Sequence, residues 1–316
     1  QLMPVGVVVP KSINDVEATI KIAREEGLPV LPRGSGTSQN GQAIGEALLI
    51  DTTRHLNQVI DFNAEKNTVC VEPGLVLDQL NRFLKPHGLF YPVDVSTANR
   101  ATLGGMTGNN SCGARSIRYG NMVHNVLSIE ALLADGSKAH FKKFGEGSEN
   151  VSEALSTQLL NLGKRESKEI DERFPKLLRR VGGYNIDELT KQSPNLGRLL
   201  VGSEGTLGFF QKIHLQLQPI PKEKVLGVCH FPTFYEAMES TQHIVKLDPA
   251  AVELVDRTMI DLARAIPLFA PTVDRFVQGE PDALLLVEFA GEDRAEQLSK
   301  LADLGELMAD MGFPDS

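Results

Sequence analysis

The stretch PVLPRGSGTSQNGQ, residues Pro29–Gln42, places three glycines and three hydroxyl residues directly after an apolar segment. Such residues suit any solvent loop that needs a left-handed backbone, but consecutive amides without Cβ atoms can also surround an anion such as phosphate. Gly36 is not followed by the lysine of a P-loop, and the spacing is not that of the Rossmann fingerprint. The stretch therefore predicts either a surface loop or an anion-binding nest that belongs to another fold.

Composition narrows the class of protein. The chain has 316 residues, enough for about two domains, and a net charge of −9 without a basic stripe, which argues against a nucleic-acid surface. No apolar run is long enough to span a membrane. Three widely spaced cysteines without a C-x-x-C pair are typical of a reducing compartment, so we expect a cytoplasmic protein. Because Gln1 is not an initiator residue, we expect the chain to be part of a longer protein.

Strands and helices alternate in the first part of the chain. A helix is predicted to begin at Ser12, with Asp15 at the capping-box position, and to end at Gly27. Hydrophobic periodicity predicts a second helix over residues 75–88. The predicted strands cover residues 5–10, 28–34, 47–53, 55–62 and 67–74.

The later part continues this alternation. A hairpin over residues 125–141 is expected to turn at Asp135–Gly136. Surface helices are expected within residues 148–192, and a strand over residues 208–221 ends in prolines. We place a domain boundary near Pro219, after which a strand followed by a helix occurs three times.

Two further glycine-rich passages accompany the first. PVDVSTANRATLGGMTGNNSCGARSIRYGN, residues Pro92–Asn121, shows no helical or alternating pattern, and so long an irregular stretch is usually functional. LLVGSEGTLGFF, residues Leu199–Phe210, adds a backbone-rich turn before a strand. Three such loops at strand ends indicate an extended ligand wrapped by main chain, and a dinucleotide fits that description.

The motifs RGSGTSQNGQ, VEPG, STANRATLGGMTGNNSCGARSIRYG, ADG and GSEGTLG resemble, in this order, flavoproteins of the vanillyl-alcohol oxidase type. Among these the chain is most similar to the FAD-linked D-2-hydroxyacid dehydrogenases, which act on D-lactate, glycolate or D-2-hydroxyglutarate. The segment RRVGGYNIDEL resembles the long bacterial members that carry an iron-sulfur domain.

The resemblance implies an α+β fold. Residues 1–219 would form a PCMH-type FAD-binding domain of two α+β subdomains, about 1–90 and 91–219. Residues 220–316 would form part of an α+β substrate cap domain.

Cofactor-binding residues follow from the same resemblance. The pyrophosphate loop would contain Arg33, Gly34, Ser35, Gly36, Thr37, Ser38 and Gln42. The rest of the FAD channel would be lined by Pro92, Ser96, Thr97, Thr102, Gly104, Gly105, Asn109, Ser111 and Gly113. The adenosine half would lie beside Gly202, Glu204, Gly205 and Thr206, with Glu204 accepting from a ribose hydroxyl. The alternative for any single hydroxyl is a turn or a cap.

The mode of attachment can be read at one position. Members that bind FAD covalently through this loop carry a histidine where Thr37 stands, so the resemblance implies non-covalent FAD. Cys112 lies in the expected channel, where it is either a small packed residue or a second attachment point or redox thiol.

In the resembling family, hydride leaves the α-carbon of a 2-hydroxy acid for flavin N5 while a base takes the hydroxyl proton. The cap motif H-x-x-H-G-D-G-N-L-H, which holds that base and the metal-binding histidines, is absent here, and we expect it beyond Ser316. No pair of the seven histidines has metal-ligand spacing, so no metal site is expected in the chain. Arg118, Tyr119 and His124 are the catalytic candidates within it.

Other functions on this fold stay open. They are a reductase or synthase that uses the same flavin fold, and a non-catalytic flavin-binding module. We expect an electron acceptor whose identity the sequence does not give. A homo-oligomer and peripheral attachment to the inner membrane through that acceptor stay open. An iron-sulfur cluster or a divalent metal is expected only in a further part of the protein.

Overall fold

The computed structural model describes residues 2–145, 151–177 and 179–314. The chain forms two compact units, of which the first comprises Gln1–Gly113 and Tyr119–Ile220. The second comprises Ala114–Arg118 and Pro221–Ser316. The main division thus lies one residue from the predicted boundary, whereas the assignment of residues 114–118 to the second unit was not predicted.

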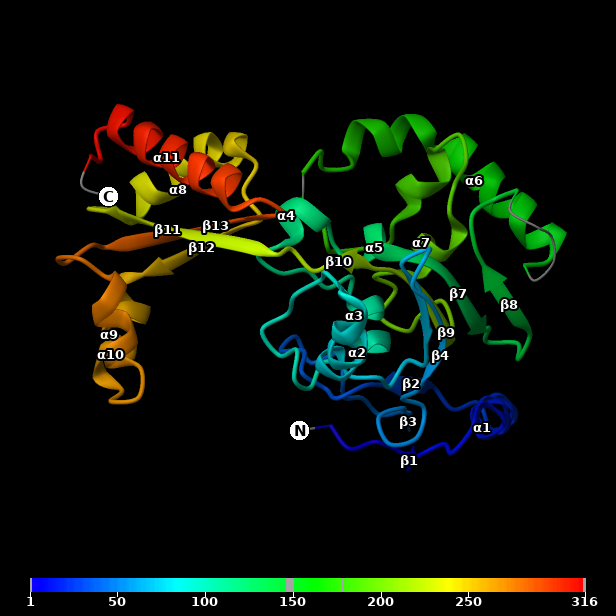
Figure 1. The fold of residues 1–316 in the computed structure, drawn as a ribbon. Helices are drawn as coiled ribbons and strands as arrows, with labels where there is room; N and C mark the ends of the chain where they lie inside the picture. Colours follow the sequence, from blue (N-terminus) through cyan, green and yellow to red (C-terminus); the bar gives the residue numbers. More distant parts are fainter. Residues whose placement is uncertain (1, 146–150, 178, 315–316) are drawn as a thin grey trace. The chain divides into compact units, whose positions relative to one another are not determined.

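The first unit begins with a small parallel sheet. Strands β1 (Gly6–Val8), β3 (Leu48–Asp51) and β2 (Val30–Arg33) lie in this order. Helix α1 (Ile13–Glu25) begins as predicted, because the Ser12 amide donates to Asp15 Oδ2 at 2.9 Å. Its buried face carries Val16 and Ile20, which form a core cluster with residues of this sheet and of the five-stranded sheet described next. The glycine-rich loop begins directly after β2, which is labelled in Figure 1.

A five-stranded antiparallel sheet forms the centre of the first unit. Its order is β4 (Val59–Asn63), β5 (Thr68–Val71), β9 (Phe209–Gln216), β7 (Val126–Leu132) and β8 (Lys138–Phe141). The predicted hairpin is confirmed: β7 pairs with β8, and Gly136 takes the left-handed conformation (φ 83°) in the turn. Because β4 and β5 belong to this sheet, strand pairing crosses the position near residue 90 where we expected two subdomains to divide.

Short helices surround this sheet. The predicted second helix is α2 (Leu77–Leu84), followed by the 3₁₀ turn η1 (Lys85–His87). Helix α6 (Glu153–Arg173) packs against the 3₁₀ turn η2 (Ile186–Thr190), which leads to α7 (Leu196–Leu200). A two-stranded ribbon pairs β6 (Leu89–Phe90) with β10 (Gln218–Pro219).

The expectation that residues Pro92–Asn121 lack helices was wrong. They contain α3 (Leu103–Asn109) and α4 (Ser116–Tyr119), and α5 (Met122–Asn125) follows. Glycine is a poor helix former, and three of the seven residues of α3 are glycine. The glycines allow α3 to pack closely against its neighbours, since a Cβ on Gly104 would clash with Pro73 Cβ at 2.5 Å. Close packing, which no local pattern reveals, therefore stabilises this helix.

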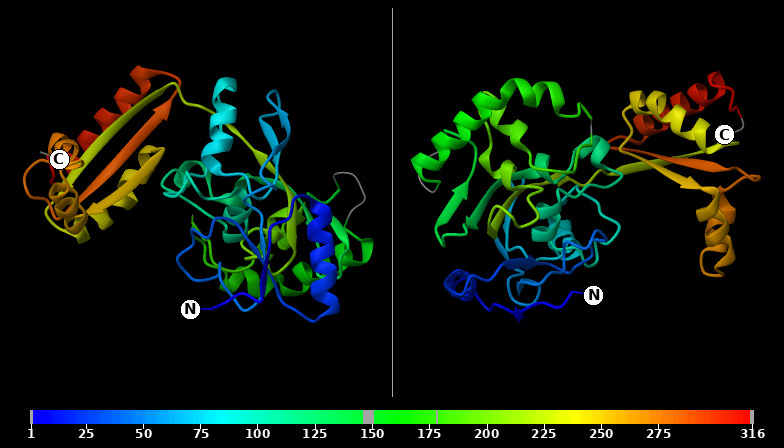
Figure 2. Two further views of the ribbon diagram at one scale, coloured as in Figure 1. Left: turned by 90° about the horizontal axis from the view of Figure 1, so that it is seen from below. Right: turned by 180° about the vertical axis from the view of Figure 1, so that it is seen from behind.

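The second unit is a three-stranded antiparallel sheet with helices on both faces. Its order is β11 (Glu223–Phe231), β13 (Ala283–Gly291) and β12 (Ala251–Asp256). Figure 2 shows α8 (Phe234–Ile244) and α11 (Arg294–Asp310) on one face, with α9 (Arg257–Ala265) and α10 (Ala270–Phe276) on the other. The 3₁₀ turn η3 (Val245–Leu247) follows α8. The predicted strand–helix repeat is present with α10 added, and no described helix is long and apolar enough to cross a membrane.

Candidate cofactor site

A cavity of about 350 Å³ lies in the first unit, where the loop after β2, helix α3 and the turn before β9 meet. Its volume is within the range of small-molecule and cofactor sites, roughly 300–1,000 Å³. Arg33 and Glu204 are the charged side chains of its described lining. The rest is glycine backbone, hydroxyls, amides and apolar side chains, which suits a ligand held mainly by the main chain.

All three glycine-rich passages supply residues to this cavity, as the sequence predicted. The members of the predicted set that line it are Arg33, Gly34, Ser35, Gly36, Thr37, Ser38, Gln42, Ser96, Thr97, Thr102, Gly104, Gly105, Asn109, Ser111, Glu204 and Gly205.

Four members of the predicted set do not line the cavity, and three of them have a structural role visible in the fold. Gly113 is needed for packing, since a Cβ there would lie 1.5 Å from the carbonyl oxygen of Asp94. Gly202 adopts φ 80° in the turn before β9. The Thr206 hydroxyl donates to the carbonyl of Ser203 at 2.6 Å. Pro92 precedes the cavity-lining part of its passage.

The glycine-rich loop is shaped by its own backbone and by Arg33. Gly36 adopts φ 67°, a conformation that L-residues with a Cβ rarely take. A Cβ on Gly36 would also lie 2.6 Å from Arg33 Nη2, so the guanidinium lies directly against the loop. The Ser35 hydroxyl donates to the carbonyl of Arg100 at 2.5 Å, which ties the loop to the passage before α3.

Helix α3 begins against this loop. Thr102 is its N-cap, and its hydroxyl accepts from the Gly105 amide at 3.3 Å. The same hydroxyl lies so close to Gly34 that a Cβ there would be 2.1 Å from Thr102 Oγ1. Gly34 is therefore required by the approach of two segments, which is a use of glycine independent of any ligand.

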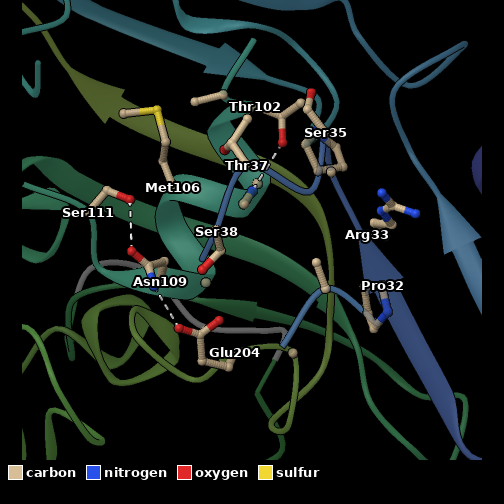
Figure 3. Close-up of a pocket in the computed structure, with 18 of the residues that line it drawn as sticks. Pro32, Arg33, Ser35, Thr37, Ser38, Thr102, Met106, Asn109, Ser111 and Glu204 are labelled. Carbon is tan, nitrogen blue, oxygen red and sulfur yellow. Dashed lines mark hydrogen bonds between the residues drawn. The ribbon is translucent and has the colours of Figure 1, made fainter. Parts of the chain in front are cut away.

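Three polar side chains form a short hydrogen-bonded row along the cavity, drawn in Figure 3. The Ser111 hydroxyl donates to Asn109 Oδ1 at 3.2 Å, and the Asn109 amide donates to Glu204 Oε1 at 2.9 Å. Glu204 adopts φ 51°, and its backbone amide donates to the carbonyl of Gly108 at 2.9 Å. The turn before β9 is thus attached to α3 by both backbone and side chain.

Sequence reasoning missed part of the lining. Val181 belongs to the segment RRVGGYN, which we had used only for its resemblance to a family subgroup. The Arg180 carbonyl beside it accepts from the Asn110 and Asn121 side-chain amides at 3.4 and 3.1 Å, and Tyr184 bonds Thr206 at 2.7 Å. The other lining residues not predicted are Pro32, Ala43, Thr52, Pro73, Val95, Ala101, Met106, Gly108, Asn110, Gly208, Phe209 and Phe210.

None of the three catalytic candidates lines the cavity. In the second unit, Arg118 donates to the carbonyl of Ala290 at 2.6 Å and pairs with Asp248 at 3.2 Å. The Tyr119 ring packs edge-on against Phe90 with centroids 5.7 Å apart. His124 accepts from the Asn121 amide through Nδ1 at 3.0 Å at the start of α5. Each of the three makes a contact within its own unit.

The cysteines differ in their surroundings. Cys112 lines the cavity and is partly exposed, so its thiol is the one placed beside a ligand. Cys70 and Cys229 are buried strand residues, and burial raises the pKa of the Cys70 thiol to about 11. Among the described residues, no group of three or more histidine, cysteine, aspartate or glutamate side chains could hold a metal ion.

The cavity has features that fit the FAD implied by the sequence. Gln42 Oε1 is a buried acceptor in the lining that has no hydrogen-bond partner among the described residues, so a ligand donor would satisfy it. All five residues from Gly34 to Ser38 line the cavity, and two of them are glycines without a side chain that could cover their amides. Uncovered amides beside an arginine suit phosphate oxygens.

Comparison with known proteins agrees with this geometry. A family described as "FAD binding domain" matches residues 4–142, and one described as "FAD linked oxidases, C-terminal domain" matches residues 220–315. D-2-hydroxyglutarate dehydrogenase of Escherichia coli is 35% identical over 98% of this chain and 32% of its own length. Probable mitochondrial D-lactate dehydrogenase of Danio rerio is 33% identical over 82% of this chain and 44% of its own length. The chain thus spans about a third to under half of the length of these relatives.

A solved structure of alkyldihydroxyacetonephosphate synthase shares the fold. It matches with a TM-score of 0.69 and 18% identity, over 96% of this chain and 50% of the other. The resemblance inferred from the motifs and the α+β fold are thereby confirmed. The chain belongs to the FAD-linked oxidases, with an FAD-binding domain and sequence from the C-terminal domain of that family, and its cofactor is FAD.

Proposed function

We propose that the chain holds FAD non-covalently and that the natural protein uses it to oxidise a 2-hydroxy acid of the D-2-hydroxyglutarate, D-lactate or glycolate type. The observation that carries the proposal is the main-chain-lined cavity with its unsatisfied acceptor, Gln42 Oε1. The relatives named for dehydrogenation of D-2-hydroxy acids support the substrate class.

In this proposal, bound FAD supplies the acceptor for the hydride that leaves the α-carbon of the substrate. The chain's contribution is to bind and orient the cofactor. Amides of residues 34–38 would hold the phosphates beside Arg33, and the Glu204 carboxylate, oriented by Asn109, would accept from a ribose hydroxyl. Phe209, Phe210 and Met106 are among the apolar residues of the lining, and they would limit the access of water.

The residues of the lining support the non-covalent mode of binding in this proposal. Thr37 stands where covalent members have a histidine, and no histidine lines the cavity within the described residues. Cys112 is the one nucleophile in that lining able to form a stable bond to the flavin ring. Arg118, Tyr119 and His124 lie outside the lining, so the base that takes the hydroxyl proton is not assigned to any of them.

Two further parts of the proposal concern the electron acceptor and the place in the cell. Electrons would pass from the reduced cofactor to a separate acceptor, and the protein would act in the cytoplasm.

Acid precipitation of purified, yellow protein tests the mode of attachment. We expect the pellet to be colourless and the supernatant to contain FAD. Colour retained in the pellet of wild type but lost in Cys112→Ala would instead show attachment through that thiol. Failure of added FAD to bind at all would contradict the cofactor site itself.

Anaerobic mixing of the FAD-loaded natural protein with D-2-hydroxyglutarate, D-lactate, glycolate and the L-enantiomers tests the reaction. We expect bleaching of flavin absorbance near 450 nm, in the manner of two-electron reduction (roughly one substrate per flavin), by a D-acid or glycolate. Bleaching by NADPH and by none of the hydroxy acids would favour a reductase. No bleaching by any of these would favour a binding module.

A further inference from the structure

A second cavity, of about 140 Å³, lies in the first unit beside η2, α5 and α7. It shares no lining residue with the cofactor cavity. Its volume is well below the roughly 300 Å³ at which pockets for drug-sized ligands begin. Only a few water molecules or one small ion would fill it.

The charged groups of this cavity do not balance. Arg180 pairs with Asp187 at 2.5 Å, and Lys191 pairs with Glu188. The third cation, Arg198, has its nearest recorded carboxylate oxygen, Glu188 Oε2, 4.0 Å from Nη1. With three cations against two carboxylates, the described lining carries one excess positive charge, which belongs to Arg198.

Arg198 also has an unsatisfied donor. Its Nη2 donates to the carbonyl of His124 at 3.2 Å, but its Nε is buried and has no hydrogen-bond partner among the described residues. A buried charged donor without an acceptor is costly, so such groups are normally paired. Because Arg198 lines the cavity, an anion bound there would lie beside its guanidinium and offset the excess positive charge.

His124 adds a second donor. Its Nδ1 accepts from the Asn121 amide at 3.0 Å, so a neutral ring must carry its proton on Nε2. Burial, followed by the charge of Arg198, lowers the pKa of His124, which keeps the ring neutral at neutral pH. Lys191, half exposed, provides further donors at the rim.

Glu188, the carboxylate recorded nearest to Arg198, does not serve as the missing acceptor. Glu188 is almost fully buried, and its Oε1 accepts from the Asn195 amide at 3.1 Å while its Oε2 accepts from Lys191. Both oxygens are therefore held in place by other donors. Turning the carboxylate toward Arg198 Nε would break one of these bonds.

From these observations we propose that the second cavity binds a small oxyanion, a carboxylate or a phosphate, with Arg198 as its main ligand. His124 and Lys191 complete the donor set. The site is adjacent in sequence to the cofactor cavity: Arg180 lines one and Val181 lines the other. For this reason the test uses protein already loaded with FAD, so that an added anion cannot compete for the phosphate positions of the cofactor.

The direct test is calorimetric titration of the FAD-loaded chain with sodium phosphate and, separately, sodium acetate, at constant ionic strength set with sodium chloride. We expect saturable binding of one anion per chain, and the stronger of the two salts identifies the oxyanion. The midpoint of thermal unfolding should rise with that salt and not with chloride, since a ligand of the folded state stabilises it. Absence of saturable binding by both salts overturns the proposal.

Two variants locate the site. Arg198→Gln should weaken binding at least about tenfold, because it removes a charged hydrogen-bond donor. Arg179→Gln, which removes the same charge at an exposed position next to the cavity segment, should leave the dissociation constant unchanged within about twofold. Equal loss in both variants would show general charge attraction and would overturn the site.

A spectroscopic measurement on wild type covers the case in which Arg198→Gln does not fold. With FAD bound, the ring resonances of His124 should shift on saturation with the anion, and the pKa of the ring should rise because a negative charge now lies nearby. Unchanged His124 resonances at saturating anion would contradict the proposal, whatever the variants show.

Discussion

The side-chain amide of Asn109 donates to Glu204 Oε1 at 2.9 Å and joins the last residue of α3 to the turn before β9. The two residues are 95 positions apart in the sequence. Because Asn109 holds one carboxylate oxygen, Glu204 is restrained beside the cofactor cavity rather than free to turn into solvent. In the proposed function, this restraint would give the carboxylate a defined place from which to bind a cofactor hydroxyl.

The first prediction tests that role. Glu204→Ala should raise the Kd for FAD about tenfold or more, because a hydrogen bond to a charged group is worth roughly 1.5–3 kcal/mol. Glu204→Gln should cause a smaller loss, since its amide oxygen can still accept. Glu172→Ala, which removes an exposed carboxylate on α6, is the control. Titration followed by flavin fluorescence gives the three constants, and equal values for all variants would remove Glu204 from the site.

A second prediction concerns the backbone at Gly36. Gly36→Val should raise the Kd for FAD at least about tenfold, because the left-handed conformation costs a residue with a Cβ about 1–2 kcal/mol and the new side chain would press on Arg33. Gly27→Val is a close match, since Gly27 has φ 65° but open surroundings outside the cavity. It should lower stability without changing FAD affinity.

Ser38→Ala completes that experiment. It lies in the same loop and removes a hydroxyl while leaving the amide in place. A small effect of Ser38→Ala beside a large effect of Gly36→Val would show that the main chain binds the cofactor. The reverse order would assign binding to the side chains of the loop.

The three loops could be predicted because glycine-rich passages at strand ends are local features that appear in any reading of the sequence. Helix α3 could not be predicted, because its glycines locally oppose helix formation. Gly104 lies against Pro73, which is distant in sequence, and Gly105 lies against Thr102, which precedes the helix. Gly113 was predicted to line the FAD channel because the sequence shows only that a glycine is present. It does not show whether a cofactor or the nearby Asp94 carbonyl requires that glycine.

Val181 was missed for a different reason. A single valine in an irregular segment has no pattern of its own, and its position depends on hydrogen bonds from Asn110 and Asn121 to the carbonyl of Arg180. These asparagines are fully buried, which sequence composition does not indicate. Long-range polar contacts of this kind became visible only in the folded chain.

The third prediction is a pH dependence of stability. His140 lies on β8 and stacks on His214 with ring centroids 5.5 Å apart. Its Nε2 forms a hydrogen bond with Ser128 Oγ at 2.9 Å. Burial has the largest effect on the pKa of His140 and lowers it. The charges of His214, Lys142 and Lys212 lower this pKa further, whereas Glu130 raises it. The folded state therefore favours the neutral ring.

The sign follows from proton binding. Between the lowered pKa of His140 in the folded state and its unfolded value of about 6.5, the unfolded chain binds more protons than the folded chain. The free energy of unfolding therefore falls as pH drops through this window, and the contribution of the neutral ring is complete above it. His140→Gln should reduce the fall in the free energy of unfolding measured by urea titration between pH 7 and pH 5. An unchanged slope in the variant would show that His140 does not contribute to it.

The last prediction uses the close approach of Gly34 to Thr102. Gly34→Ala should destabilise the FAD-binding domain and weaken FAD binding, because its Cβ would lie 2.1 Å from Thr102 Oγ1, which is incompatible with the present packing. Thr102→Ala alone should cost about 1 kcal/mol through loss of the N-cap of α3. In the double variant the clashing oxygen is absent, and the nearest remaining Thr102 atom, Cβ, would be 3.3 Å away.

The double variant should therefore be more stable than the sum of the two single losses predicts, with a coupling of about 0.5–3 kcal/mol in the favourable direction. Urea titrations of the four proteins without FAD give this coupling, and FAD titrations show whether the loop recovers its binding conformation. Strict additivity would mean that the chain relieves the Gly34→Ala clash by moving the loop away from α3. FAD affinity should then stay low in the double variant, because the amides of residues 34–38 would no longer be held against the start of α3.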